Sequence, residues 1–499
     1  MEEFDVVVVG GGPGGSTAAT LVSMQGHRTL LLEKEHFPRY QIGESLLPST
    51  VHGICRLTGA WDFLKDAGFP KKRGGTFRWG SNSEPWTFAF SVSPKMAGQT
   101  SFAFQVERMK FDQILLENAE RKGAVVRQGC SVTDVLFEGE RASGVEYVDG
   151  DGSTHQVAAK FVVDASGNGS RIYRHLGERQ YSEFFRSLAL FGYFENGKRL
   201  PEPNSGNILS AAFDSGWFWY IPLSPTLTSV GAVVSSEMAR KVQGDPEKAL
   251  LSLIEECPLI ADYLSTAERV TSGPYGQLRV RKDYSYHNTK FWRPGVILIG
   301  DAACFVDPVF SSGVHLATYS ALLAARSINS VLAGGMDEST AFTEFERRYR
   351  REYGLFYEFL MSFYDMHRSE ESYFWSAKKI TASELPELES FVELIGGVAS
   401  NDRTISSSAE VVQRFVAGSA AFTHAVEQII DDEEGSMLPL LKSSVAGPAL
   451  RESSQIQAQA LYGVDAENEV PLFADGLVVS SDGMSWSRPG TEVPERSAT

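Results

Sequence analysis

The sequence predicts an α/β (α+β) fold in which a parallel-sheet module is interrupted by an antiparallel sheet and followed by a helical C-terminal region. Three observations support this prediction. A β-branched run at 4–9 leads directly into the glycine-rich stretch 10–15, as in a buried parallel strand that is followed by a helix. Residues 185–290 contain the strand patterns and turns of an antiparallel sheet. After residue 365 the pattern becomes helical and more polar.

The elements of the module follow in order along the chain. Apolar residues at helical spacing come after the glycines, and residues 29–32 form the next strand, so the chain opens with a βαβ unit. An amphipathic helix is expected at 106–123, where a glycine ends it, and further strands follow. A buried strand at 296–299 precedes a long helix at 313–333.

These elements divide the chain into four expected regions. They are a module formed by residues 1–184 and 291–365, an antiparallel-sheet region at 185–290 on the substrate side, a mostly helical region at 366–479, and a tail at 480–499. The tail is polar, contains prolines and lacks periodicity, so we expect it to be loosely held.

Composition restricts the possible partners. The 499 residues carry a formal net charge of −17, which argues against a nucleic-acid partner. Four widely spaced cysteines without a CxxC pair indicate neither a metal site nor a disulfide framework. The acidic N-terminal stretch lacks a basic targeting segment, and no apolar run reaches membrane-spanning length. We therefore expect a cytoplasmic protein without a metal or a membrane partner.

The first candidate site is the glycine-rich turn. It satisfies GxGxxG, and the candidate cofactor-binding residues are Gly10, Gly12, Pro13, Gly14, Gly15 and Ser16. Glycines permit the tight Rossmann-like turn and let a pyrophosphate approach the helix N-terminus, where N–H groups and the dipole favour anions. Glu33 ends the second strand, where a carboxylate can bind ribose hydroxyls. The segment predicts dinucleotide binding.

Two further strand ends indicate which dinucleotide is bound. FVVDASG at 161–167 and VILIGDAA at 296–303 each run from a buried strand into a turn of small residues. In this order, the three segments resemble the FAD module of the para-hydroxybenzoate hydroxylase type. The resemblance implies that Asp301 holds the ribityl chain and that Arg108 contacts FAD. Because no second GxGxxG is present, reduced flavin is expected to come from a separate flavin reductase.

Four motifs together resemble a flavin-dependent halogenase. They are FPRYQIGESLLP at 37–48, the lysine of FPKKRGGTFRWG at 69–80, GWFWYIP at 216–222 and DPVFSSGVHLA at 307–317. Within that family the chain is most similar to halogenases of non-ribosomal glycopeptide antibiotic biosynthesis, which act on tyrosyl or β-hydroxytyrosyl groups borne by a peptidyl carrier protein. The resemblance also places Arg39, Glu44, Gly313 and Val314 at the FAD.

The resemblance implies a route for chlorine. Reduced FAD and O₂ give a flavin hydroperoxide, which oxidises chloride to hypochlorous acid, and a lysine relays the chlorine to the substrate. A serine before a long helix is an N-cap, and the neighbouring N–H groups can hold an anion or polarise the flavin edge. The resemblance implies that Ser312 and Gly313 are the halide site. The chain offers Lys71 and Lys72, and the downstream motif favours Lys72 as the catalytic lysine.

The GWFWYIP strand provides a flat aromatic surface. In an alternating strand, Trp217, Trp219 and Ile221 face one side, and Pro222 ends the strand before its hairpin partner at 227–234. Core packing explains part of this pattern. The resemblance implies in addition that these residues, with Phe310, keep the substrate away from the flavin and thereby prevent hydroxylation.

One departure from the family pattern points to the substrate. Halogenases of free tryptophan carry a glutamate where this chain has Phe310. A phenol or a pyrrole activates its own ring, so Phe310 predicts such a substrate and leaves the base for ring deprotonation unassigned. A flavin-dependent hydroxylase or reductase on the same fold, or a non-catalytic FAD-binding protein, stays as an alternative. The candidates for the substrate entrance are His315, His367, Tyr353 and Tyr357.

Overall fold

The structure, a computed structural model, describes most of the chain. The described residues are 1–82, 84–96, 98–282, 285–365, 370–381, 383, 385–400, 402, 404–405 and 471–489. The chain forms two units, of which the first comprises Met1–Ser406 and Ser480–Trp486. The second unit comprises Ser407–Val479 and Ser487–Thr499, and the structure describes only 471–479 and 487–489 of it. The sequence-predicted site residues that the structure describes lie in the first unit.

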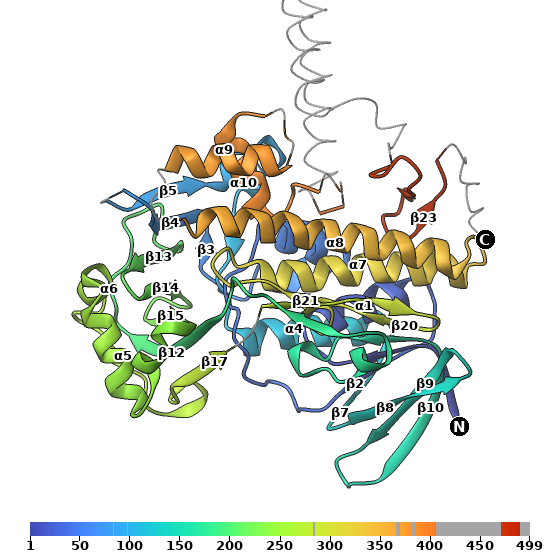
Figure 1. The fold of residues 1–499 in the computed structure, drawn as a ribbon. Helices are drawn as coiled ribbons and strands as arrows, with labels where there is room; N and C mark the ends of the chain where they lie inside the picture. Colours follow the sequence, from blue (N-terminus) through green and yellow to red (C-terminus); the bar gives the residue numbers. More distant parts are fainter. Residues whose placement is uncertain are drawn as a thin grey trace, which may run out of the picture. The chain divides into compact units, whose positions relative to one another are not determined.

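A mixed sheet with a parallel centre forms the base of the first unit (Figure 1). Its strand order is β19-β20-β10-β1-β2-β7, with β8 and β9 attached beside β10. The bounds are β1 Glu2–Val9, β2 Thr29–Glu33, β7 Val125–Gln128, β8 Ser131–Glu138, β9 Arg141–Val148, β10 Thr154–Asp164, β19 Trp292–Arg293 and β20 Val296–Leu298. Strand β1 pairs in parallel with β2 and β10, and β10 with β20, which confirms the predicted βαβ start.

Helices cover this sheet. They are α1 Pro13–Met24, α4 Arg108–Arg121, α7 Ser312–Leu332 and α8 Glu338–Phe363. Helix α1 contacts both α4 and α7, and α7 and α8 run side by side in Figure 1. The sequence-predicted helices at 106–123 and 313–333 are confirmed within two residues.

The second sheet is mostly antiparallel, with the order β16-β12-β15-β14-β13-β4-β5 and β17 beside β12. Its strands are β4 Gly74–Arg78, β5 Trp86–Ala89, β12 Ser187–Glu195, β13 Ile208–Phe213, β14 Gly216–Pro222, β15 Leu227–Ser235, β16 Glu268–Arg269 and β17 Arg279–Lys282. Helices α5 Pro246–Glu255 and α6 Pro258–Tyr263 pack on one of its faces. Strands β4 and β5 belong to this sheet, although they lie within residues 1–184.

Shorter elements complete the described chain. They are a π-helical segment Ser49–Ile54, α2 Cys55–Leu57, α3 Trp61–Leu64, β3 Lys71–Lys72, β6 Ala103–Phe104, β11 Arg179–Tyr181, β18 Tyr286–Asn288, β21 Cys304–Phe305, α9 Glu370–Thr381, α10 Glu387–Gly396, β22 Val478–Val479 and β23 Trp486–Ser487. Helices α9 and α10 agree with the helical pattern after residue 365. The rest of the expected helical region, through residue 470, lies outside the described residues apart from short pieces before residue 406.

The beginning of the expected tail is held firmly. The backbone N–H of Trp486 donates to Ser330 Oγ at 2.8 Å, and its Nε1 donates to Ser327 Oγ at 2.9 Å. The Trp486 side chain is buried against α7. Residues 480–486 are therefore part of the first unit, which corrects the expectation of a loose tail for this stretch. The correction has a physical reason: one tryptophan and a few turn bonds fix the stretch, and neither produces a periodic pattern.

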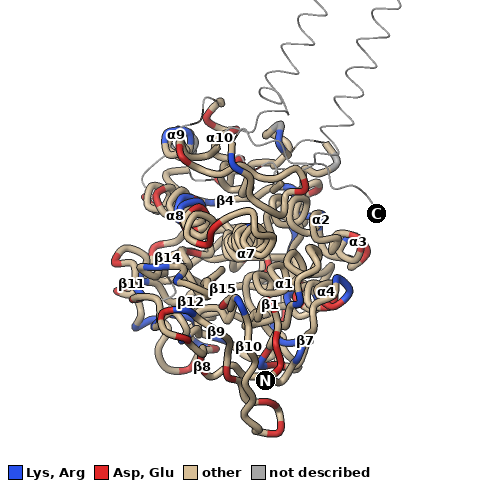
Figure 2. The backbone as a smooth tube through the Cα atoms, turned by 90° about the vertical axis from the view of Figure 1, so that its right-hand side faces the viewer, with Lys and Arg blue, Asp and Glu red and all other residues tan. Residues whose placement is uncertain are grey.

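The distribution of charge, the hydropathy of the helices and the state of the cysteines add three findings. Figure 2 shows Lys and Arg interspersed with Asp and Glu along the described chain. None of the helices in the described ranges combines the length and the apolar character that a membrane crossing requires. All four cysteines are buried and unpaired.

Candidate active site

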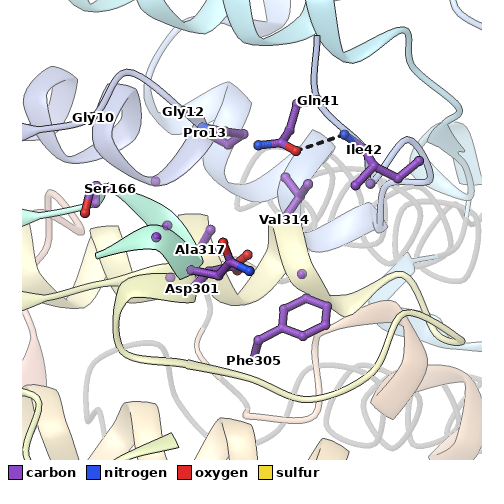
Figure 3. Close-up of a pocket in the computed structure, with 18 of the residues that line it drawn as sticks. Gly10, Gly12, Pro13, Gln41, Ile42, Ser166, Asp301, Phe305, Val314 and Ala317 are labelled. Carbon is purple, nitrogen blue, oxygen red and sulfur yellow. Dashed lines mark hydrogen bonds between the residues drawn. The ribbon is translucent and has the colours of Figure 1, made fainter. Parts of the chain in front are cut away.

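A cavity of about 900 Å³ lies at the carboxyl ends of the parallel strands (Figure 3). It collects residues from both sheets and from the start of α7, far apart in the sequence. The sequence-predicted residues that line it are Gly10, Gly12, Pro13, Gly14, Glu33, Arg39, Glu44, Arg108, Trp217, Trp219, Ile221, Asp301, Gly313 and Val314. This is the place where open α/β sheets bind nucleotides.

Gly15 and Ser16 do not line the cavity but shape the turn beside it. A Cβ at Gly15 would lie 1.9 Å from the carbonyl oxygen of Gly10, so only glycine lets α1 approach β1 this closely. Gly10 itself has φ +101°, which also favours glycine. Ser16 Oγ donates to the carbonyl of Gly11 at 2.9 Å. Their contribution to a cofactor site is therefore indirect.

Two acidic residues line the cavity, and they differ in the hydrogen bonds that their carboxylates accept. Glu33 accepts bonds from the backbone N–H groups of Gly11, at 2.6 Å, and Glu35, at 2.9 Å. The Asp301 carboxylate receives no hydrogen bond from any described residue, and burial raises its pKa to about 6. Asp301 is half-buried and lines the cavity, so its carboxylate can accept hydrogen bonds from the hydroxyl groups of a ligand. The set of polar groups fits a ribityl and a ribose chain, and thus FAD.

Arg108 and Arg39 brace the loop that borders the cavity. Hydrogen bonds to Asp112 and to the carbonyls of Ile42 and Gly43 occupy four of the five N–H groups of Arg108. Arg39 also binds Asp112, at 2.8 Å. Most of the N–H groups of Arg108 already donate to other residues of the protein. The main structural effect of Arg108 is therefore to fix the segment that carries Glu44.

The predicted alternation of the GWFWYIP strand is confirmed. Trp217, Trp219 and Ile221 line the cavity, whereas Phe218 and Tyr220 pack into the core beneath α5 and α6. Pro222 lies at the end of the strand, which pairs with β15 as expected. Gly231 of β15 stands opposite Trp219, and a Cβ there would lie 2.2 Å from the indole ring. We call Trp217, Trp219 and Ile221 the tryptophan wall.

Sequence reasoning missed a polar chain that holds the tryptophan wall. Trp217 Nε1 donates to the Tyr364 hydroxyl at 2.8 Å, and this hydroxyl donates to Asp307 Oδ2 at 3.0 Å. Asp307 is fully buried, which raises its pKa to about 7. Only the Asp-Pro pair before the α7 motif hinted at this role, because Tyr364 lies 57 residues further along the chain.

Replacing Tyr364 by phenylalanine is expected to destabilise the first unit by about 1–3 kcal/mol, because two buried polar groups lose their shared partner. The free energy of unfolding from urea titration measures the effect. Tyr353→Phe in α8, the helix that ends just before Tyr364, is the control. The Tyr353 hydroxyl makes no hydrogen bond among the described residues. Equal stability of the two variants would contradict the bridging role of Tyr364.

Lys72 lies beside a second, small cavity of about 10 Å³, roughly the space of one water molecule. The lysine is 3% exposed, its Nζ donates to the carbonyl of Leu46 at 3.1 Å, and Ser311 Oγ lies 3.5 Å away. Burial lowers the pKa of Lys72 to about 7. Ser311 and Ile208 line both cavities. These two residues therefore lie between the Lys72 amine and the large cavity.

The low pKa of Lys72 predicts a pH-dependent stability. Between about pH 7 and pH 10.5 the unfolded chain binds a proton at this lysine that the folded chain does not, so stability falls as the pH is lowered through this window. Relative to Lys72→Met, the wild-type protein is expected to lose about 2 kcal/mol between about pH 9.5 and pH 7.5. Urea titrations at both pH values measure this difference. Lys71→Met, at the exposed neighbour, should show no such dependence.

The start of α7 carries the two residues expected to hold the halide. Ser311 precedes the helix in the left-handed conformation, with φ 61° and ψ 26°, and its side chain makes no capping hydrogen bond to a described residue. Gly313 lines the large cavity and Ser312 does not, and the buried Ser312 Oγ has no hydrogen-bond partner among the described residues. Backbone donors that are not used by the helix lie at this terminus.

Phe310, and the candidates for the substrate entrance that the structure describes, do not line the large cavity. Phe310 lines the small cavity and packs against Phe77, Phe359 and Phe363. It therefore lies on the Lys72 side rather than in the tryptophan wall. His315 is buried between Ser49 and Glu352, with bonds of 2.9 and 2.8 Å, and lines neither cavity. Tyr353 and Tyr357 also line neither, and His367 lies outside the described residues.

Comparison with known proteins identifies the family. The model of the tryptophan halogenase family matches residues 5–97 and 92–425. The solved structure of the myxobacterial chondrochloren halogenase, described as a variant of FAD-dependent halogenases, is 52% identical and superimposes with a TM-score of 0.74. The alignment covers 98% of this chain and 100% of that chain. The chain belongs to the flavin-dependent halogenases.

Curated relatives agree with this assignment. Tryptophan 2-halogenase of Chondromyces crocatus is 36% identical over 385 residues, which cover 76% of this chain and 71% of that protein. The 1H-pyrrole-2-carbonyl-(peptidyl-carrier protein) chlorinase of Pseudomonas fluorescens is 32% identical over 386 residues, 73% of this chain and 84% of that protein. As a flavin-dependent halogenase, the protein is an oxidoreductase that uses reduced FAD and a halide and needs a flavin reductase as partner. The fold expectation is confirmed, and membership of this family favours halogenation over the hydroxylase and non-catalytic alternatives.

Proposed function

We propose that this flavin-dependent halogenase chlorinates a phenolic ring, tyrosyl or β-hydroxytyrosyl, that a peptidyl carrier protein presents as a thioester. The observation that carries the proposal is Phe310 at the small cavity beside Lys72. An apolar ring at this place offers no carboxylate to polarise an unactivated substrate, whereas a phenol supplies its own activation. The resemblance of the sequence motifs to glycopeptide-antibiotic halogenases supports the tyrosyl class and that pathway. The chlorinase from Pseudomonas fluorescens is also named for a substrate that is bound to a carrier protein.

The residues divide the chemistry between the two cavities. In this proposal FAD lies in the large cavity, with its pyrophosphate at the N-terminus of α1 and its ribityl hydroxyls at Asp301. Bound reduced FAD and O₂ supply the two-electron oxidant that converts chloride into hypochlorous acid. The N–H groups of Ser312 and Gly313 hold the chloride, and the tryptophan wall keeps the organic substrate out.

Lys72 connects the two cavities in this proposal. With a pKa near 7, a large fraction of its amine is neutral at neutral pH and can act as a nucleophile. The nitrogen takes up chlorine while hydroxide leaves, and the nitrogen-bound proton joins that hydroxide as water. The ring then attacks the chlorine, the N–Cl electron pair returns to the nitrogen, and the proton that the ring loses restores the amine. The buried site keeps hypochlorous acid away from solvent-exposed methionines.

The experiment offers the enzyme a set of acceptors. Purified protein receives reduced FAD from a flavin reductase, O₂, chloride, and one acceptor at a time: tyrosyl-carrier, β-hydroxytyrosyl-carrier, pyrrolyl-carrier, free tyrosine or free tryptophan. Mass spectrometry is expected to show replacement of hydrogen by chlorine on a tyrosyl carrier and not on free tryptophan. Chlorination of free tryptophan or of the pyrrolyl carrier in preference to both tyrosyl carriers would refute the proposed substrate class. Chlorination of free tyrosine at an equal rate would refute the carrier requirement.

A further inference from the structure

A chain of hydrogen-bonded hydroxyl groups runs from the half-buried Tyr40 to a buried carboxyl group of the large cavity. The Tyr40 and Tyr193 hydroxyls lie 2.8 Å apart, and the Tyr193 hydroxyl donates to Glu44 Oε1 at 2.7 Å. Tyr40 is half-buried and also lines the large cavity, whereas Tyr193 and Glu44 are 0% and 2% exposed. Because Tyr193 uses its only proton toward Glu44, Tyr40 must donate to Tyr193. The chain therefore has one direction, from Tyr40 inward to Glu44.

The inner end of this chain lies beside the tryptophan wall. Glu44 lines the large cavity together with Trp219 and Ile221. The Ser229 hydroxyl interacts with the Glu44 carboxyl and also accepts a bond from Trp219 Nε1 at 3.2 Å. Glu44 Oε2 makes no hydrogen bond with any described residue, so one oxygen of this carboxyl group is available to a ligand of the cavity.

The surroundings of Glu44 keep its proton mobile. The charged and titratable groups that face it are Tyr40 on its own segment, Tyr193 of β12, Glu107 and Arg108 at the start of α4, and Tyr275 at the segment before β17. Burial raises the pKa of Glu44 to about 7, and the bond from Tyr193 offsets part of that rise. Burial also raises the pKa of both tyrosines, that of Tyr40 to about 12, so both stay neutral hydroxyls that can pass a proton.

The halogenase reaction consumes protons. Reduced FAD, O₂, chloride and one proton give oxidised FAD, hypochlorous acid and water, so each turnover takes up at least one proton. The tryptophan wall and Glu44 line the large cavity together. A titratable group beside the wall can therefore supply that proton as a general acid.

We propose that Tyr40, Tyr193 and Glu44 form a proton relay that delivers protons from solvent to the large cavity during oxidant formation. Glu44 gives its proton to the acceptor in the cavity and becomes a carboxylate. Tyr193 then passes its proton to Glu44, Tyr40 passes its proton to Tyr193, and water restores Tyr40. Each O–H bond that breaks is replaced by one that forms, and the net transfer is one proton. The relay rests on FAD occupying the large cavity and is independent of the proposed phenolic substrate.

The first test reads the relay without flavin. Infrared titration of the full-length protein free of FAD is expected to show a carboxyl carbonyl band with a midpoint near pH 7 that is absent from Glu44→Gln. In Tyr193→Phe this midpoint rises, because the carboxylate loses a donor. In Tyr40→Phe the midpoint stays close to that of the wild type. A midpoint that Tyr193→Phe leaves unchanged would overturn the proposal.

The second test measures proton delivery. Reoxidation of bound reduced FAD by O₂, with chloride present, is followed in water and in deuterium oxide. Tyr40→Phe and Tyr193→Phe are each expected to slow the proton-dependent phase between about 10-fold and 100-fold, and Glu44→Gln by about 100-fold or more. Tyr275→Phe is the matched control, because Tyr275 touches the Tyr193 ring but its hydroxyl donates to Glu107.

Binding titrations separate the relay from a purely structural network. Tyr40→Phe, Tyr193→Phe and Tyr275→Phe are expected to bind FAD within about threefold of the wild type. If Glu44→Gln loses FAD binding, Glu44 is a cofactor ligand and the relay is refuted. If Tyr40→Phe and Tyr193→Phe match Tyr275→Phe in rate and isotope effect, the hydroxyls only satisfy buried polar groups, and the relay is refuted as well.

Discussion

Lys72→Ala is expected to lower the rate of halogenation by about 10³-fold or more while FAD binding stays within about threefold of the wild type. Lys72 lies at the small cavity, and its nitrogen lies 3.5 Å from Oγ of Ser311, which lines both cavities. FAD binding is retained because Lys72 does not line the large cavity. The measurements are product formation by mass spectrometry and flavin titration by fluorescence.

Lys71→Ala provides the matched control for this loss. Lys71 and Lys72 form the two-residue strand β3, so their side chains point to opposite sides. Lys71 is exposed and lies 4.8 Å above the Phe102 ring. Its removal is expected to change the halogenation rate by less than about twofold. Equal losses in both variants would show that the segment, rather than the buried amine, is required.

The pH dependence distinguishes two roles of Lys72. If the amine takes up chlorine as a nucleophile, the rate rises with pH through about 7, where Lys72 loses its proton. If the ammonium form only donates a hydrogen bond to hypochlorous acid, the rate falls across the same range. We expect the rise, because burial favours the neutral amine. The profile has to be measured with reduced FAD supplied in excess, so that the reductase does not limit the rate.

The first sheet was predictable because its signals are local. A β-branched strand, the glycine turn and the helix after it lie within the first 24 residues, and their pairing partners obey the general rules of βαβ units. The place of strands β4 and β5 in the second sheet was not predictable, for the opposite reason. Strand β4 pairs in parallel with β13, which lies more than 120 residues further along the chain. No local pattern records a pairing of that kind.

The candidate site was predictable where a motif fixed the residue. GxGxxG, Asp301 and the alternation of the GWFWYIP strand led to residues that share one cavity. The choice between Lys71 and Lys72 depended on the family resemblance, because a two-residue strand carries no periodicity. Tyr193, Tyr364 and Asp307 act through hydrogen bonds between distant segments. Their role depends on the tertiary structure, and sequence patterns do not contain it.

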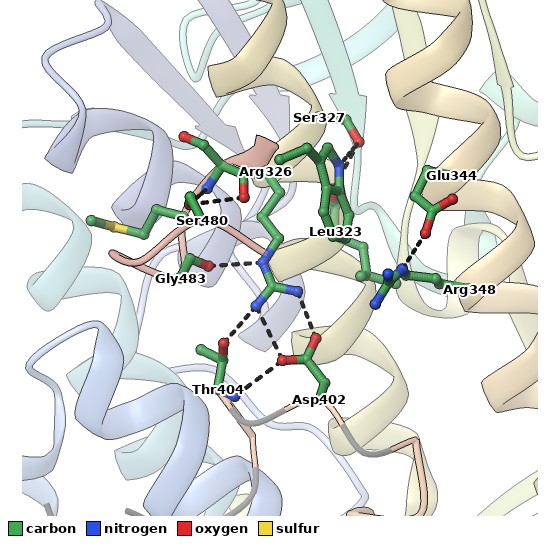
Figure 4. Close-up of polar contacts among 12 residues, drawn as sticks. Leu323, Arg326, Ser327, Glu344, Arg348, Asp402, Thr404, Ser480 and Gly483 are labelled. Atoms are coloured by element: carbon green, nitrogen blue, oxygen red, sulfur yellow. Dashed lines mark hydrogen bonds and ion pairs between the residues drawn. The ribbon is translucent and has the colours of Figure 1, made fainter. Parts of the chain in front are cut away.

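Asp402→Ala is expected to destabilise the first unit by about 3–5 kcal/mol, because it leaves the buried Arg326 guanidinium without its counter-charge. Both side chains are inaccessible to solvent, and they form two bonds of 2.6 and 3.2 Å (Figure 4). Arg326 also donates to the carbonyl of Gly483 at 2.8 Å and to Thr404 Oγ1 at 2.7 Å. The arginine thus joins α7 to two other segments of the first unit. Urea titration of the full-length protein measures the loss.

A double replacement and an exposed pair make this prediction specific. Asp62→Ala breaks a solvent-exposed pair with Lys65 of similar length, 3.0 Å, and should cost no more than about 1 kcal/mol. Arg326→Met combined with Asp402→Leu removes both charges and should recover part of the loss of Asp402→Ala, since an apolar pair avoids the desolvation cost. Recovery stays incomplete because Gly483 and Thr404 still lack their donor. If the double variant is less stable than Asp402→Ala alone, the unpaired charge is not the cause, and the bonds to Gly483 and Thr404 hold α7 instead.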